Sequence, residues 1–170
     1  MTTLNPTVLR EAFGQFPTGV TVVTAVADAG TPVGFTANSF SSVSLDPPLL
    51  LVCPGRSMSC FSVFETCQHF AVNVLAEGQQ DISNKFAKHQ GDRFNEIPWR
   101  QDATGMPLID GAAVQFSCTT YKVVDAGDHI ILIGGIDTVV SSDRPGLVFV
   151  SGGYLSLAQE RETTQAPDNS

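Results

Sequence analysis

The stretch GFTANSFSSVSLDPP, residues 34–48, stands out for its density of short hydroxyl and amide side chains. It links one apolar segment, residues 33–37, to another, residues 49–53. Short polar side chains beside exposed backbone suit the polar edge of a flat heterocycle held at the rim of a sheet. The same residue types also serve ordinary turns by bonding to their own backbone. On chemistry alone, both interpretations stay open.

The segments around this stretch are predicted to be strands. Residues 20–27 are rich in Val and Thr and are separated from residues 33–37 by turn-forming residues, which predicts a hairpin. The apolar run at residues 49–53 is typical of a strand buried on both faces. Further strands are predicted at residues 70–75, 113–124, 129–140, 147–150 and 154–157.

Short helices are expected as inserts between the strands. Residues 8–16 carry apolar side chains at helical spacing until Pro17, and this helix is expected to cap one end of a barrel. Ser57 is a preferred N-cap residue and predicts a helix that runs to Thr66. Residues 79–88 are predicted to form a polar helix.

These elements predict a mostly-β domain with short helices. About seven strands occur without a repeated β-α-β alternation, so a closed antiparallel barrel is favoured over a doubly wound sheet. Residues 99–107 are expected to be irregular. The domain is expected to cover residues 1–157, and the polar tail at residues 158–170 is expected to be disordered.

Composition excludes several classes of protein. The 170 residues are 42% hydrophobic and 15% charged, as in a folded single domain. The formal net charge of -8 has the wrong sign for a nucleic-acid partner. No apolar run approaches the length of a membrane span, and no targeting signal is evident at the start. We therefore expect a cytoplasmic protein without a nucleic-acid or membrane partner.

The chain lacks the usual signatures of metal and hydrolytic chemistry. Its four cysteines contain no C-x-x-C pair, so free thiols and no metal site are expected. Neither a dinucleotide fingerprint nor a P-loop is present, and no nucleophile elbow with a triad can be placed. Three histidines are few for acid-base catalysis. A bound cofactor that carries the chemistry would resolve this.

Basic residues gather in one part of this acidic chain. Residues 85–100 contain Lys85, Lys88, Arg93 and Arg100, together with His89. Such a cluster is either a solvated helix and loop or a dock for a phosphorylated ligand.

The chain resembles the flavin reductase-like family of short-chain flavin reductases, and residues 34–48 resemble its signature. Three segments resemble its first-strand entry, its mid-chain strand and its closing motif: residues 16–24, 70–75 and 152–154. Gly127-Asp128-His129 resembles the family motif associated with the nicotinamide nucleotide. The likeness covers about residues 9–157 and implies an antiparallel, Greek-key-like split β-barrel that binds FMN and forms a homodimer.

The resemblance implies a flavin site built from several segments. Residues expected against or near the isoalloxazine and ribityl groups are Thr36, Ala37, Asn38, Ser39, Ser42 and Val43. Arg56 and Ser57 are expected to hold the flavin phosphate, and an arginine before a helix start favours an anion independently. The other expected contacts are Cys53, Lys85, Phe86 and Tyr154.

His129, with Asp128 beside it, is expected to face the nicotinamide as the catalytic residue. The implied activity is hydride transfer from NADH or NADPH to FAD or FMN, with release of reduced flavin to a partner monooxygenase or halogenase. Two alternatives remain on similar barrels: a pyridoxamine-phosphate-oxidase-like flavoprotein, and a non-catalytic module that binds flavin or haem. A third is an interaction protein without a ligand, which would leave the polar stretch without a purpose.

Overall fold

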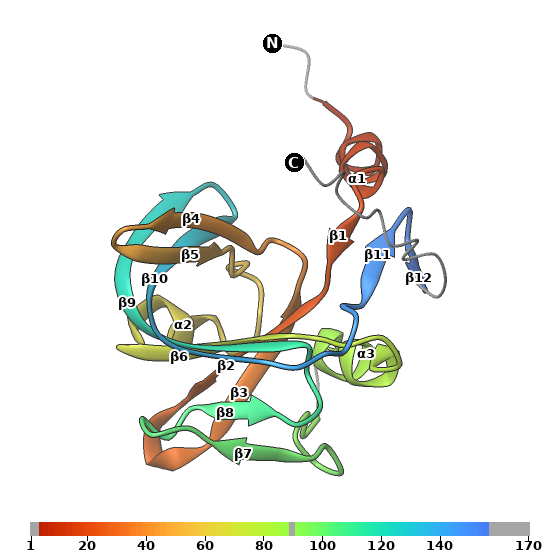
Figure 1. Ribbon diagram of the computed structural model, residues 1–170. Coiled ribbons are helices and arrows are strands. Elements are labelled where there is room, and N and C mark those ends of the chain that lie inside the picture. Colours follow the sequence, from red (N-terminus) through yellow and green to blue (C-terminus); the bar gives the residue numbers. More distant parts are fainter. Residues whose placement is uncertain (1–3, 89–90, 157–170) are drawn as a thin grey trace, which may run out of the picture.

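The computed structural model describes residues 4–88 and 91–156, so the predicted tail lies outside the described residues. Its main element is a seven-stranded sheet with the order β3-β2-β6-β9-β10-β5-β4, antiparallel throughout (Figure 1). The strands are β2 (Thr21–Val26), β3 (Pro32–Ala37), β4 (Ser41–Leu45), β5 (Pro48–Val52), β6 (His69–Val74), β9 (Val114–Ala126) and β10 (His129–Ser141).

The sheet curls until its two edge strands approach each other. β3 and β4 lie at opposite edges, yet only residues 38–40 connect them. A flat sheet of seven strands would hold its edges about 29 Å apart, whereas the chain from Ala37 to Ser41 spans at most about 15 Å. The connecting residues also contact the residue that follows β5 (Pro48–Val52), because the Ser39 hydroxyl accepts a hydrogen bond from the Cys53 N–H at 3.0 Å. This curled, open sheet agrees with the predicted split barrel.

Smaller elements surround the main sheet. Figure 1 shows α1 and a three-stranded sheet grouped at one side of it, while β7 and β8 pair separately. Their bounds are α1 (Pro6–Gly14), β1 (Thr18–Gly19), η1 (Asp28–Gly30), α2 (Phe61–Thr66), α3 (Gln80–Ala87), β7 (Trp99–Gln101), β8 (Pro107–Ile109), β11 (Val148–Val150) and β12 (Gly153–Leu155).

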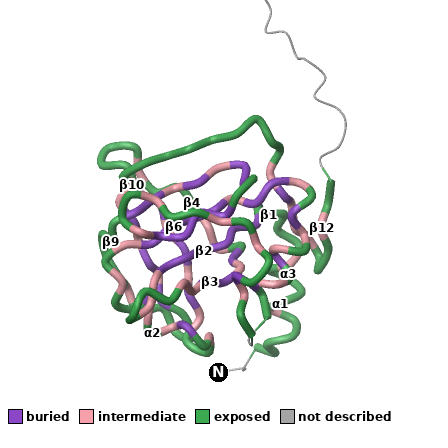
Figure 2. Tube along the Cα trace, turned by 90° about the horizontal axis from the view of Figure 1, so that it is seen from below, coloured by how far each residue is buried: buried purple, intermediate pink, exposed green. Residues whose placement is uncertain are grey.

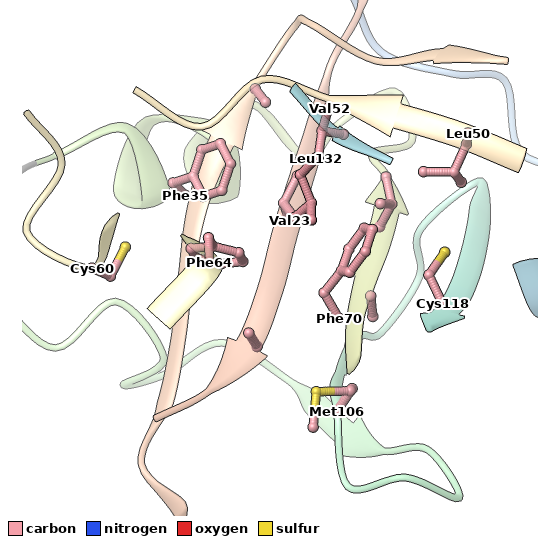
Figure 3. Close-up of a cluster of buried hydrophobic side chains, with 14 of the residues drawn as sticks. Val23, Phe35, Leu50, Val52, Cys60, Phe64, Phe70, Met106, Cys118 and Leu132 are labelled. Carbon is pink, nitrogen blue, oxygen red and sulfur yellow. The ribbon is translucent and has the colours of Figure 1, made fainter. Parts of the chain in front are cut away.

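Two apolar clusters hold the fold together. The larger lies inside the curl, where Phe35 and Phe64 meet edge to face with ring centroids 4.9 Å apart and Phe70 is fully buried (Figure 3). The smaller lies under α3 and includes Phe86 and Ile109. Each fully buried side chain of this size stabilises the fold by roughly 1.5–3 kcal/mol. Figure 2 shows buried residues concentrated along β2 and β6.

The predicted hairpins are confirmed. β2 pairs with β3 in antiparallel register, and β9 pairs with β10 along almost their whole length. The turn between β9 and β10 consists of Gly127 and Asp128, and Gly127 has a φ of +67°. A glycine tolerates this backbone conformation without strain. The turn therefore allows His129 to begin β10 directly beside Ala126.

The prediction that the first helix caps the barrel is wrong. α1 has no buried residue, and its apolar side chains Val8 and Phe13 are 57% and 73% exposed. Phe16, just after the helix, is 74% exposed. Helical spacing of apolar residues reports that a helix has an apolar face, but not which surface covers that face. Within the described residues of this chain, nothing buries it.

The predicted start of the second helix is also wrong. α2 begins at Phe61, and the residues from Gly55 onward form successive turns instead. The Met58 N–H bonds to the Gly55 carbonyl at 3.1 Å, and the Phe61 N–H bonds to the Met58 carbonyl at 3.1 Å. Ser57 therefore caps no helix, and the argument that a helix dipole at Ser57 attracts phosphate fails.

Four strands escaped prediction: β1, β4, β7 and β8. Residues 99–107 contain β7, which pairs with β8 across a turn organised by Asp102. The Asp102 carboxylate accepts hydrogen bonds from the N–H groups of Thr104 and Met106 at 2.8 and 2.9 Å. β4 lies within the polar stretch and was missed because serine is not a strong strand former.

Candidate functional site

A cavity of about 550 Å³ opens where the end of β3, the end of β5 and the β9–β10 turn meet. Its volume falls within the range of small-molecule sites. Seven of its lining residues are predicted site residues: Thr36, Ala37, Asn38, Ser39, Cys53, Ser57 and His129. The fold thus brings together three segments that lie far apart in the sequence.

Short polar side chains form one wall of this cavity, and backbone groups orient them. The Thr36 hydroxyl donates to the Ser83 carbonyl at 2.6 Å, which leaves its oxygen able to accept. The Ser39 hydroxyl accepts from the Cys53 N–H at 3.0 Å, which leaves its proton able to donate. Asn38 is exposed and borders this cavity and two neighbouring ones. The wall therefore offers both donors and acceptors on short stems.

His129 stands on another wall of the cavity. Its Nδ1 lies 2.7 Å from a carboxylate oxygen of Asp128, and this hydrogen bond lowers the pKa of the Asp128 carboxyl. The bond favours the tautomer with its proton on Nδ1. His129 also forms an isolated antiparallel bridge with Gly55. A Cβ atom built on Gly55 would lie 3.3 Å from Nε2, so the imidazole packs closely over this glycine.

Cys53 lines the cavity with its partly buried side chain. Burial raises the pKa of its thiol, and the hydrogen bond with Ser39 offsets this only in part. Because the thiolate is the reactive form, a raised pKa keeps this group protonated at neutral pH. That Cys53 lines the flavin site without acting as a nucleophile stays a prediction.

A second cavity, of about 430 Å³, shares Thr36 and Asn38 with the first. Tyr154 lines it, and the Tyr154 hydroxyl lies 2.8 Å from the Ser83 hydroxyl and 2.9 Å from the Asn84 side-chain oxygen. Tyr154 thereby joins β12 to α3. The two cavities adjoin at the rim formed by the end of β3.

Several predicted residues lie away from these cavities. Ser42 and Val43 are exposed on β4, and the Lys85 ammonium bonds to the Asn95 carbonyl. Phe86 is only 1% exposed and lies 4.9 Å from Phe94, ring to ring. We therefore assign Phe86 to the core rather than to the site.

Arg56 does not line the cavity either. Its guanidinium bonds to Asp125 and lies 3.5 Å from Glu65. Asp128 is 95% exposed and contributes through its bond to His129.

Sequence reasoning missed five residues of the cavity wall: Phe35, Gly55, Met58, Ala126 and Ile131. Ala126 and Ile131 flank the predicted β9–β10 turn, so the hairpin prediction could have placed them near His129. No sequence pattern marked Gly55, because its role arises from its contact with His129, which is far away in the sequence.

Within residues 4–88 and 91–156, no group of three or more His, Cys, Asp or Glu residues could hold a metal ion. Among the same residues, no helix is long and apolar enough to span a membrane.

Comparison with known proteins identifies the family. A model of the flavin reductase like domain matches residues 13–158. The reductase component of the flavin-dependent trigonelline monooxygenase of Acinetobacter baylyi is 53% identical over 89% of this chain and 49% of that protein. This chain thus spans about half the length of that relative. The FMN reductase (NADH) SmoA of Agrobacterium fabrum is 41% identical over 89% of this chain and 86% of that protein.

A solved structure agrees with these matches. The NADH:FAD oxidoreductase of Streptomyces globisporus, in complex with NAD and FAD fragments, is 37% identical and has a TM-score of 0.87. The match covers 95% of this chain and 100% of that one. The fold, the site and the matches together show that this chain belongs to the flavin reductase-like family.

Proposed function

We propose that this chain is an NAD(P)H-dependent flavin reductase, which reduces FAD or FMN and releases the reduced flavin to a separate monooxygenase or halogenase. The observation that carries the proposal is the 550 Å³ cavity, which sets the polar rim at residues 36–39 and His129 in its walls. The relatives support it, since one is named an FMN reductase (NADH) and another the reductase component of a monooxygenase.

The rim residues are suited to hold a flavin reversibly. The oriented hydroxyls of Thr36 and Ser39 match the alternating acceptors and donors along the polar edge of a flavin ring. The second cavity begins at Thr36 and Asn38, so the chain attached to the ring can continue past Tyr154. Short neutral contacts at an open rim favour a ligand that dissociates over one that is held permanently.

Positioning is the main task that the chain's own residues perform. When bound, the two nucleotides supply the redox chemistry, hydride transfer from nicotinamide C4 to flavin N5. Asp128 holds the imidazole of His129 through Nδ1, which leaves Nε2 to contact the nicotinamide nucleotide. Holding two rings face to face at reacting distance supplies much of the rate enhancement in such a reaction. The hydride transfer itself requires no side chain that acts as a general acid.

An assay with purified protein tests this proposal. NADH and NADPH are each combined with FAD, FMN and riboflavin, and the loss of nicotinamide absorbance is followed. We expect flavin-dependent oxidation with at least one pair and free reduced flavin as the product. Flavin binding without any oxidation of NADH or NADPH would instead indicate a non-catalytic flavin-binding module.

His129→Ala is expected to raise the KM for NADH about tenfold, because a contact to the nicotinamide nucleotide is lost. The Kd for flavin, measured by quenching of its fluorescence, should stay within about twofold of the parent value. The matched control is His69→Ala, since His69 bonds to Thr119 on an exposed surface and lines no part of the cavity. Equal effects of both variants on KM would contradict the role of His129.

We also propose that two copies of the chain associate through the apolar side of α1. Val8, Phe13 and Phe16 are each more than half exposed, and Figure 2 shows α1 as mostly exposed. Phe16 lines a cavity of about 350 Å³ that shares Asn38 with the flavin site. A partner covering Phe16 would therefore lie next to that site.

Replacing Phe13 and Phe16 together by Glu is expected to convert a dimer into a monomer, because burying two carboxylates in an apolar contact is strongly unfavourable. Light scattering coupled to size-exclusion chromatography measures the mass directly. Tyr121→Glu is the control, because Tyr121 is also exposed, at 61%, but lies on β9. A monomeric parent protein would refute the proposed association.

A further inference from the structure

Arg56 joins three segments of the fold. Its guanidinium bonds to Asp125 near the end of β9 and lies 3.5 Å from Glu65 on α2. The guanidinium carbon also lies 5.2 Å from the centre of the Phe61 ring. The backbone N–H of Arg56 donates to the Asp128 carbonyl at 2.9 Å. Arg56 therefore holds the end of the β9–β10 hairpin against α2 and the loop that follows β5.

The same hairpin end carries His129, and His129 contacts the same loop. The Ile130 N–H donates to the Pro54 carbonyl at 3.0 Å, next to the bridge between Gly55 and His129. The imidazole packs so closely over Gly55 that an added Cβ would lie 3.3 Å from its Nε2. The loop and the hairpin end are adjacent walls of the cavity. Their relative position therefore determines where the imidazole lies.

The ion pair between Arg56 and Asp125 affects the position of the β9–β10 hairpin end more than the stability of the fold. The two side chains are 38% and 87% exposed, and an exposed pair contributes roughly 0–1 kcal/mol to folding. A guanidinium bound to a carboxylate nevertheless restricts the geometry of the groups that it joins. Arg56 is not among the residues that line the cavity.

We propose that Arg56 is a positioning residue, which fixes the place of His129 through Asp125 and thereby sets the affinity for the nicotinamide nucleotide. This inference rests on the proposed function. It replaces the expectation that Arg56 binds the flavin phosphate, because both carboxylates near Arg56 already compensate its charge.

Four single variants test this role. Arg56→Met keeps an apolar stem over Phe61 but removes the donors, and Asp125→Asn removes the charge of the partner. Both are expected to raise the KM for NADH about five- to tenfold, with kcat and the flavin Kd within about twofold of the parent. Glu65→Gln should match the parent, because it leaves the link to the hairpin intact. Arg56→Lys should recover part of the loss, since it restores the charge without the planar fork.

A double variant separates positioning from direct binding. In the His129→Ala background, Arg56→Met should raise the KM for NADH by less than about twofold, because an effect that passes through His129 is already lost. Additive effects would overturn the proposal. A flavin Kd weakened about tenfold with an unchanged KM for NADH would also overturn it, and would make Arg56 a phosphate ligand.

A measurement without substrates keeps this inference distinct from the proposed function. The NMR signal of the His129 imidazole, assigned with His129→Ala, should shift in Arg56→Met and Asp125→Asn of the ligand-free chain but not in Glu65→Gln. An unchanged signal in the first two variants would refute the positioning role. If the parent protein oxidises no NADH with any flavin, the proposed function fails, while the NMR comparison still decides whether Arg56 places His129.

Discussion

Replacing Asn73 by Ala is expected to lower the free energy of unfolding by about 4 kcal/mol. Asn73 is fully buried on β6, and its side chain takes part in four hydrogen bonds. Its amide donates to the Val22 carbonyl at 3.0 Å, and its oxygen accepts from the Ile109 N–H at 2.8 Å. Alanine would leave the Ile109 N–H buried without a partner, which costs about 1–3 kcal/mol, and would also leave a cavity where the amide packed.

The control for this prediction is Val72→Ala on the same strand. Val72 is equally buried, so this change removes a comparable volume but no polar contact, and should cost about 2 kcal/mol. Urea denaturation of the two variants and the parent gives the comparison, provided that the m-values agree. A loss in Asn73→Ala no larger than in Val72→Ala would show that the hydrogen bonds contribute nothing beyond packing.

Asn73 also connects the fold to the site. By bonding to Ile109 it holds β8 against β6, and Ile109 belongs to the apolar cluster under α3. α3 in turn supplies the Ser83 carbonyl that orients the Thr36 hydroxyl at the cavity rim. Loosening β8 is therefore expected to weaken flavin binding as well as stability.

Six of the seven strands of the main sheet, all but β4, were predictable because their signals are local. Alternating or continuous apolar runs and turn-forming residues marked the β2–β3 and β9–β10 hairpins. The order of strands in the sheet was not predictable in this way. It depends on pairings between distant segments, such as β6 with β9, which no local pattern reports.

Local signals failed where tertiary contacts compete with them. Ser57 is a good N-cap, but turns that lead from Gly55 to Phe61 satisfy the backbone before a helix can begin. The helical pattern of α1 was detected correctly, yet its apolar face is exposed rather than packed on the barrel. In each case the sequence indicates a local structural preference, and the tertiary contacts decide whether the fold realises it.

The site itself was only partly predictable. The rim at residues 36–39 was marked by its chemistry together with the family resemblance, and His129 by the resemblance of Gly127-Asp128-His129 to a family motif. That they line the same cavity depends on the curl of the sheet. The pairing of Arg56 with Asp125 likewise joins residues far apart in the chain, so an arginine that looked free to bind phosphate is already engaged.

Gly134→Ala is expected to lower the free energy of unfolding by about 3 kcal/mol. An added Cβ would lie 2.5 Å from the Phe70 Cζ atom and 2.9 Å from the Cys118 Cβ atom. Phe70 is fully buried and Cys118 nearly so, and neither can move without displacing other core residues. Gly134 pairs with Leu50 and Thr120, so a shift of the backbone would disturb both ladders of β10.

The neighbouring glycine provides the control. A Cβ on Gly135 would meet nothing nearer than the Thr119 carbonyl at 3.7 Å, an ordinary contact. Gly135→Ala is therefore expected to lower the free energy of unfolding by less than about 0.5 kcal/mol. It could also raise it, because alanine reduces the conformational entropy of the unfolded chain. Urea denaturation distinguishes the two substitutions. Equal free energies of unfolding for Gly134→Ala and Gly135→Ala would mean that the core beside Gly134 can accommodate an extra methyl group. The close packing of Phe70 against β10 would then contribute little to stability.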